Sequence, residues 1–118
     1  MPRVRTISRD TSADEAMAIL WEDGGVVYEN LVDEAVIHQV RAELDPYLER
    51  AYNGEGEFWG YKTKRVSSLI AKSKTYGEEL ATNPVILAVM DQILLPHCAR
   101  YHLHVTQAVA IGPGEGQQ

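Results

Sequence analysis

Five cationic side chains stand close together between Phe58 and Gly77, in a chain whose formal net charge is −6. No Asp or Glu interrupts them, so an anionic small ligand would be attracted to this segment. A solvated loop that binds no ligand is the alternative interpretation. The five residues are Lys62, Lys64, Arg65, Lys72 and Lys74.

Residues 100–111 alternate in the manner of a β-strand and bring a second set of polar groups. Thr106 and Gln107 are adjacent and therefore point to opposite faces of such a strand. Gln107 shares its face with apolar residues such as Val109, and burying an unpaired amide costs about 1–3 kcal/mol. We therefore expect Gln107 either to contact a ligand or to make a buried structural hydrogen bond.

His102 and His104 lie two residues apart on the same predicted strand, so their side chains share a face and could ligate one metal ion. Two ligands are too few for a metal site, and no nearby carboxylate shares that face. A small metal-binding jelly roll is therefore only a minor alternative.

Helices are predicted around these segments. Ser12 and Glu15 have capping-box spacing before a helix that stops at residues 23–25. A second helix starts near Asp33, with Glu43 on its polar side, and Pro46 must bend or restart it. Shorter helices are expected at residues 76–81 and 83–95.

The remaining segments are predicted as strands and loops. Residues 26–28 and 66–70 are expected to be short strands, and the first ten residues form either a loose arm or a first strand. The glycine-rich segment 53–60 contains two aromatic residues. It is either a lid over an active site or a loop that packs on the sheet.

The bulk properties limit the possible functions. With 118 residues the chain is one domain or part of one, and its acidity argues against nucleic-acid and anionic-membrane binding. Residues 85–90 are the longest apolar run, too short to cross a bilayer. Cys98 is the only cysteine and cannot form an internal disulfide, which fits a cytoplasmic protein.

The long last strand, apolar on both faces, needs neighbours from beyond this chain or from a second copy, so self-association through an open sheet edge is expected.

Three segments in order resemble one family: DGGVVYENLVDEAVIHQVRAELDPYLE at 23–49, RVSSLIAKSKTYGEELATNPVILAVMDQILLPHC at 65–98, and YHLHVTQAVAIGPGEGQQ at 101–118. Together they are similar to the N-terminal part of phytanoyl-CoA dioxygenase-like proteins. The resemblance implies an α+β fold comprising the N-terminal helices and first strands of a double-stranded β-helix, or jelly roll, which is incomplete in this chain. Residues 1–118 would then be the N-terminal portion of one Fe(II)- and 2-oxoglutarate-dependent oxygenase domain.

In that family a Pro-Gly-Glu-x-x-Gln segment runs directly into a His-x-Asp pair of iron ligands. Pro113, Gly114, Glu115 and Gln118 match the segment. The iron ligands and the 2-oxoglutarate-binding arginine are expected beyond it. The resemblance thus implies a complete protein that hydroxylates a small-molecule substrate, while the 118-residue chain alone is expected to be inactive and to bind neither cofactor tightly.

The resemblance also suggests residues that contact 2-oxoglutarate. Lys72 is the best positional match for a family lysine that contacts its carboxylate, and a lysine suits that end as a point charge with three donors. Thr106 or Gln107 would hydrogen-bond the cosubstrate from the last strand. The alternative function is a non-catalytic interaction module that another chain completes by strand addition.

Overall fold

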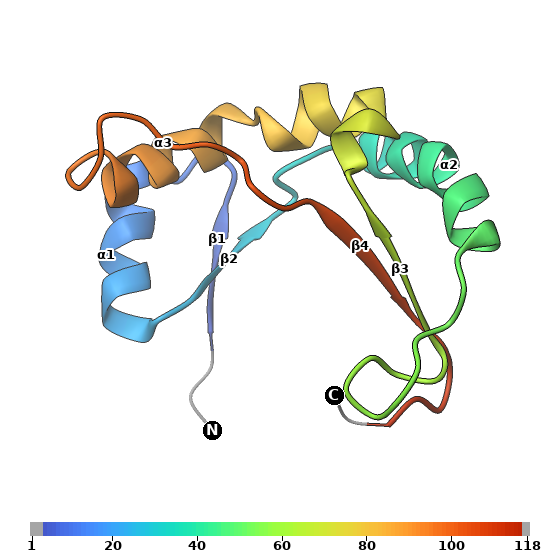
Figure 1. The fold of residues 1–118 in the computed structure, drawn as a ribbon. Helices are drawn as coiled ribbons and strands as arrows, with labels where there is room; N and C mark the ends of the chain where they lie inside the picture. Colours follow the sequence, from blue (N-terminus) through green and yellow to red (C-terminus); the bar gives the residue numbers. More distant parts are fainter. Residues whose placement is uncertain (1–3, 117–118) are drawn as a thin grey trace. The chain divides into compact units, whose positions relative to one another are not determined.

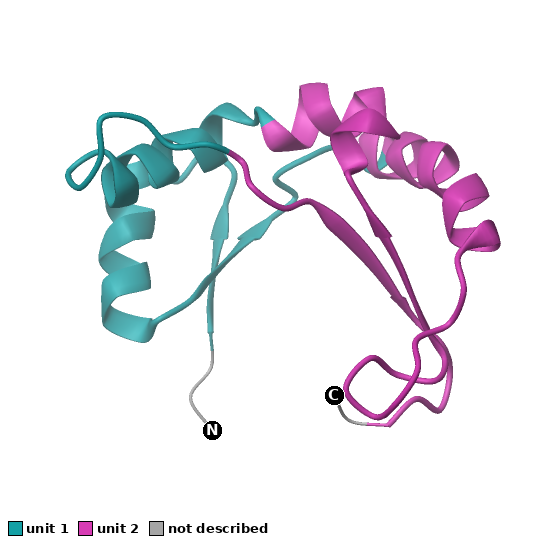
Figure 2. Cartoon of the chain, in the orientation of Figure 1, with its two compact units in different colours: residues 1–34, 82–102 teal, residues 35–81, 103–118 magenta. Residues whose placement is uncertain are grey.

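A computed structural model describes residues 4–116 and divides the chain into two compact units. Unit 1 consists of residues 1–34 and 82–102, and unit 2 consists of residues 35–81 and 103–118 (Figure 2). Both combine helices with a two-stranded sheet, so the described chain is α+β (Figure 1).

Unit 1 contains two strands and two helices, β1 (Arg5–Ser8), α1 (Ala13–Asp23), β2 (Val26–Glu29) and α3 (Pro84–Leu94). Residues 5–8 therefore form a strand rather than part of a loose arm, and β1 pairs with β2 in parallel. Buried Ala16, Met17 and Val89 join α1 to α3 in one apolar core.

The boundaries of both unit 1 helices follow the predicted signals. The Ser12 hydroxyl accepts a hydrogen bond from the Glu15 N–H at 3.2 Å. Gly24 ends α1 with a φ of 74°, a left-handed conformation that glycine adopts without steric cost. Asn83 caps α3 by accepting from the Val85 N–H at 3.0 Å.

Unit 2 is a β-ribbon covered on one face by a helix. The antiparallel strands β3 (Thr63–Ser67) and β4 (Gln107–Ile111) form the ribbon, and α2 (Glu34–Arg50) lies beside it (Figure 1). A 3₁₀ turn (Leu69–Ala71) and a π-helix (Tyr76–Ala81) follow β3. The buried core consists of Val40, Leu44, Val66 and Leu69.

The strand register divides the ribbon into two faces. Val66 and its partner Ala108 face α2 and pack in the core, so this is the inner face. The opposite face, which we call the outward face, carries the pairs that alternate with them along the strands. Its members are Thr63, Arg65, Ser67, Gln107, Val109 and Ile111.

Both predicted strands of the ribbon were placed inaccurately. The strand predicted at residues 66–70 lies earlier, because Ser68 adopts a left-handed φ of 60° and ends β3. The long strand predicted at 100–111 begins only at Gln107, since β3 offers five residues for pairing and the chain turns away at Ser68. Helix α2 also runs through Pro46 as one helix without a restart.

Within residues 4–116 each sheet has two strands and neither closes into a barrel. The jelly roll therefore stays a prediction. Among the same residues, no helix combines the length and apolar character needed to cross a membrane.

Candidate functional site

The three residues predicted to contact 2-oxoglutarate meet at one turn, residues 67–69. The Lys72 ammonium donates to the Ser67 carbonyl, and the Gln107 amide nitrogen donates to the Ser67 hydroxyl. The Thr106 hydroxyl accepts from the Leu69 N–H. Residues far apart in the sequence are thus brought together by the pairing of β3 with β4.

Gln107 lies at the end of the outward face and is exposed to solvent. Its amide nitrogen is 3.2 Å from the Ser67 hydroxyl oxygen. The expectation that Gln107 shares a buried apolar face was wrong, because α2 covers the opposite face of the ribbon. Gln107 therefore presents its amide to solvent at a position open to a ligand.

Thr106 precedes β4 and is half-buried. Its hydroxyl oxygen accepts from the Leu69 N–H at 2.8 Å, while its backbone carbonyl accepts from the Ser68 N–H at 3.0 Å. These bonds use acceptor positions only, so the hydroxyl hydrogen can still be donated. Thr106 both stabilises the turn and retains a donor.

Lys72 follows the 3₁₀ turn and bonds within its own segment. Its ammonium lies 2.6 Å from the Ser67 carbonyl oxygen and 5.6 Å from the ring centroid of Tyr47, which belongs to α2. A cation over an aromatic face is attracted by the ring quadrupole. In this arrangement Lys72 contacts the helix that covers the inner face, not the exposed amide of Gln107.

The other four cations of the predicted island do not converge on one point. Each contacts a different acceptor close to it in space, most often a backbone carbonyl oxygen. Lys62 donates to Pro113 and Gly114, Lys64 to Leu48 and Glu49, Arg65 to Trp59, and Lys74 pairs with Glu78 at 3.6 Å. The island is therefore a set of separate structural contacts around the ribbon.

Glu115 organises the opposite end of the ribbon. Its carboxylate accepts from the Lys62 N–H, from the Thr63 hydroxyl at 3.0 Å and from the Gly116 N–H at 3.1 Å. These bonds, the one from Lys62 first, lower the pKa of Glu115. In the Pro-Gly-Glu-x-x-Gln segment, Glu115 thus has a structural role, whereas Gln118 lies outside the described residues.

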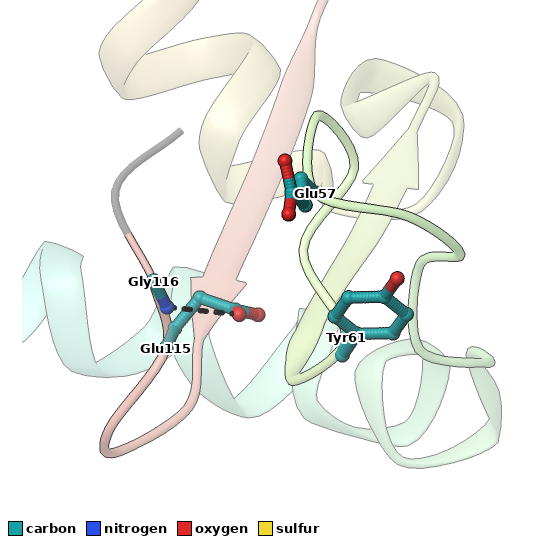
Figure 3. Close-up of a pocket in the computed structure, with 4 residues that line it drawn as sticks. All are labelled: Glu57, Tyr61, Glu115 and Gly116. Carbon is teal, nitrogen blue, oxygen red and sulfur yellow. Dashed lines mark hydrogen bonds between the residues drawn. The ribbon is translucent and has the colours of Figure 1, made fainter.

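A cavity of about 260 Å³ opens beside this carboxylate. Glu57, Tyr61, Glu115 and Gly116 line it, with the carboxylate of Glu57 coming from the glycine-rich segment 53–60 and the ring of Tyr61 from directly after it (Figure 3). Both carboxylates give the cavity negative charge, which does not suit an anionic cosubstrate.

Glu43 accepts hydrogen bonds from several side chains, a role that the sequence did not predict. Its carboxylate accepts from the Ser73 hydroxyl at 2.5 Å, the Thr75 hydroxyl at 2.7 Å and the Gln39 amide at 3.0 Å. The Ser73 bond is the largest of the causes that lower the pKa of Glu43 from 4.5 to about 2. Glu43 thereby fixes the segment that follows Lys72. Thirty residues separate Glu43 from Ser73, so no local pattern could have shown the contact.

His102 and His104 are exposed, and neither belongs to a strand. The shared strand face on which the metal alternative depended is therefore absent. Among residues 4–116, no group of three His, Cys, Asp or Glu side chains is placed to hold a metal ion.

Comparison with known proteins shows relatives along the whole chain, although no protein-family model matches it. Dioxygenase andF of Emericella variicolor is 29% identical over 123 residues, covering 100% of this chain and 43% of the relative. Dioxygenase cdmA of Talaromyces verruculosus is 27% identical, with coverage of 98% and 42%. Dioxygenase olcK of Penicillium canescens is 25% identical, with coverage of 100% and 41%.

The chain spans about two fifths of the length of these curated relatives. All three relatives are named dioxygenases. The chain is therefore similar, from one end to the other, to fungal proteins named dioxygenases.

Proposed function

We propose that this chain is the N-terminal part of a phytanoyl-CoA dioxygenase-like, Fe(II)- and 2-oxoglutarate-dependent oxygenase that hydroxylates a small-molecule substrate. The observation that carries the proposal is the similarity to dioxygenases over the whole chain, together with the fact that the chain spans only about two fifths of their length. The remaining length of such a protein would provide the iron ligands.

The two faces of the ribbon support this proposal. In a jelly roll two sheets pack face to face, so one face of each sheet meets the other sheet. Here α2 covers the inner face, while the outward face leaves Gln107, Val109 and Ile111 exposed. The outward face is thus the one on which a second sheet and a bound cosubstrate would lie.

The donors at the 67–69 turn suit a dicarboxylate. Either Gln107 would offer its amide N–H or Thr106 its hydroxyl hydrogen. The Lys72 ammonium would have to leave the Ser67 carbonyl and the Tyr47 ring to reach the same carboxylate. When bound, iron and 2-oxoglutarate would supply the electrons that activate dioxygen, the oxidant for C–H hydroxylation. The role of this chain would be to bind and orient one end of the cosubstrate.

The test begins with the coding sequence downstream of Gln118. We expect it to continue in frame into a His-x-Asp pair, and we expect the longer protein to release succinate from 2-oxoglutarate in an iron-dependent way. Replacing the first histidine of that pair by alanine should abolish the release. A longer protein that folds and releases no succinate would contradict the proposal, and stable binding to another protein would then favour the interaction module.

A further inference from the structure

The turn after β4, residues 112–116, is fastened to Lys62 at the start of β3. The Gly112 N–H donates to the Lys62 carbonyl at 2.8 Å, and the Lys62 ammonium donates to the carbonyls of Pro113 and Gly114, each at 3.2 Å. A Cβ on Gly112 would lie 2.7 Å from the Lys62 carbonyl oxygen, so only glycine allows this close approach. We call residues 112–116 the exit turn, because the chain leaves the ribbon through it.

Glu115 closes the exit turn with both oxygens of its carboxylate. One oxygen accepts from the Lys62 N–H and from the Thr63 hydroxyl. The other accepts from the N–H of Gly116, the next residue along the chain (Figure 3). An amide in place of the carboxylate could accept on one side only, because its second group is a donor. The carboxylate therefore ties the last described residue, Gly116, to the start of β3.

Thr63 anchors Glu115 from a buried position, since it is only 1% exposed. The Gly54 N–H donates to the Thr63 carbonyl at 2.8 Å, and the Thr63 N–H donates to the Gly60 carbonyl at 3.2 Å. A Cβ on Gly54 would lie 2.6 Å from the Trp59 carbonyl oxygen, so only glycine fits there. These close contacts argue against a mobile lid, one of the two roles expected for the glycine-rich segment. Glu115 is thus bonded to a buried residue that is itself held in place.

We propose that Glu115 is a positioning residue of the oxygenase, which sets where the chain leaves the ribbon and thereby where the segment after Gln118 lies. The inference rests on the proposed function, which expects the iron ligands in that segment. Only residues 117 and 118 lie between Gly116 and it, so a change in the exit turn is passed on to the ligands. Metal ligands must be held within about 0.5 Å of their productive positions, and the groups that hold them affect metal affinity.

The test titrates the longer protein with Co(II), whose visible absorption reports metal binding without turnover. We expect Glu115→Gln to weaken Co(II) binding about tenfold, because the amide cannot accept on both sides. Glu57→Gln is the matched control, since Glu57 is exposed, lines the same cavity and lies outside the exit turn. It removes the same charge and should bind Co(II) as the wild type does.

Two variants of the anchor separate positioning from charge. Thr63→Val removes the hydroxyl that donates to Glu115 and keeps every charge, so it should also weaken Co(II) binding. Thr63→Ser keeps the hydroxyl and should bind more tightly than Thr63→Val. Amide hydrogen exchange of the 118-residue chain gives a readout without metal: the N–H groups of Lys62 and Gly116 should exchange faster in Glu115→Gln, while those of α1 stay unchanged.

An unchanged Co(II) affinity in Glu115→Gln would overturn the inference, as would an equal loss in Glu57→Gln, which would mean that only charge matters. If Glu115→Gln fails to fold, Thr63→Val compared with Thr63→Ser decides by the same criterion. Succinate release by a wild type whose Co(II) affinity does not depend on Glu115 would leave the oxygenase standing without the positioning role. A folded wild type that neither binds Co(II) nor releases succinate would overturn the proposed function and the positioning role with it.

Discussion

The two compact units differ in where their carboxylates bond. Unit 1 has an apolar core and an apolar cavity of about 230 Å³ beside Val89 and Met90, and its carboxylates bond at the exposed surface, as Glu22 and Asp23 do with Arg5. Unit 2 has an apolar core of similar size, but carboxylates fix its segments: Glu43 holds residues 73–75, and Glu115 holds the start of β3. Charge-assisted hydrogen bonds of this kind specify geometry more closely than apolar contacts do. The unit with the candidate site is thus the one whose carboxylate networks are partly buried.

The largest effect should come from the unit 2 core. Leu44 is 6% exposed, and Leu44→Ala should lower the free energy of unfolding by about 2–5 kcal/mol, through lost burial and a new cavity. Urea unfolding followed by circular dichroism measures the change. Ile37→Ala on the same helix is the matched control, because Ile37 is 47% exposed and should cost far less. Equal losses in the two variants would contradict the placement of the core.

Glu43→Ala tests whether the hydrogen bonds accepted by the Glu43 carboxylate stabilise unit 2. It removes the acceptor of Ser73, Thr75 and Gln39. The urea midpoint should fall by less than in Leu44→Ala and by clearly more than in Asp45→Ala, which removes only an exposed ion pair with Arg41. A midpoint equal to that of Asp45→Ala would show that the network stabilises nothing.

The same carboxylate predicts an acid-dependent loss of stability. The pKa of Glu43 falls from 4.5 to about 2 in the folded chain, so its contribution is full above pH 4.5 and is lost as the pH drops toward 2. The urea midpoint of the wild type should decrease across this range. Glu43→Gln should decrease less, and some decrease should persist because the pKa of Glu115 is also lowered. Parallel pH profiles for the two proteins would be inconsistent with this assignment.

The smallest effect is expected in unit 1. The Tyr28 hydroxyl oxygen is buried and has no hydrogen-bond partner among the described residues, and burial raises its pKa. Tyr28→Phe should therefore leave the free energy of unfolding unchanged or raise it by up to about 1 kcal/mol. A substantial loss of stability in thermal unfolding would mean that the hydroxyl does make a stabilising bond.

Local signals predicted the helices well. Ser12, Gly24 and Asn83 mark helix boundaries through hydrogen bonds between residues only a few positions apart. Such bonds can be predicted from the residue types and their spacing in the sequence. The strands were harder to predict, because the length of β4 depends on where β3 ends and the left-handed conformation of Ser68 ends it. Apolar and polar residues alternate along residues 100–106, but this segment forms no strand because β3 does not extend far enough to pair with it.

Lys72, Thr106 and Gln107 were identified by resemblance, and their contact with 2-oxoglutarate stays a prediction. The structure shows that all three bond at the 67–69 turn, a set of contacts that the sequence did not predict. Their present bonding partners, Ser67 and Leu69, follow from the register of β3 with β4. Glu43 and the Arg65–Trp59 contact depend on tertiary structure in the same way, and no sequence spacing reports them.

The most direct test of the central claim is calorimetric titration of 2-oxoglutarate into the longer protein, loaded with Fe(II) under anaerobic conditions. We expect Gln107→Ala to weaken binding about tenfold, because one hydrogen bond to a charged group is lost from the outward face. Gln92→Ala, a glutamine of unit 1 that bonds to Asp14, should bind as the wild type does. Equal affinity in all three proteins, or no binding by the wild type, would contradict the claim that this face holds the cosubstrate.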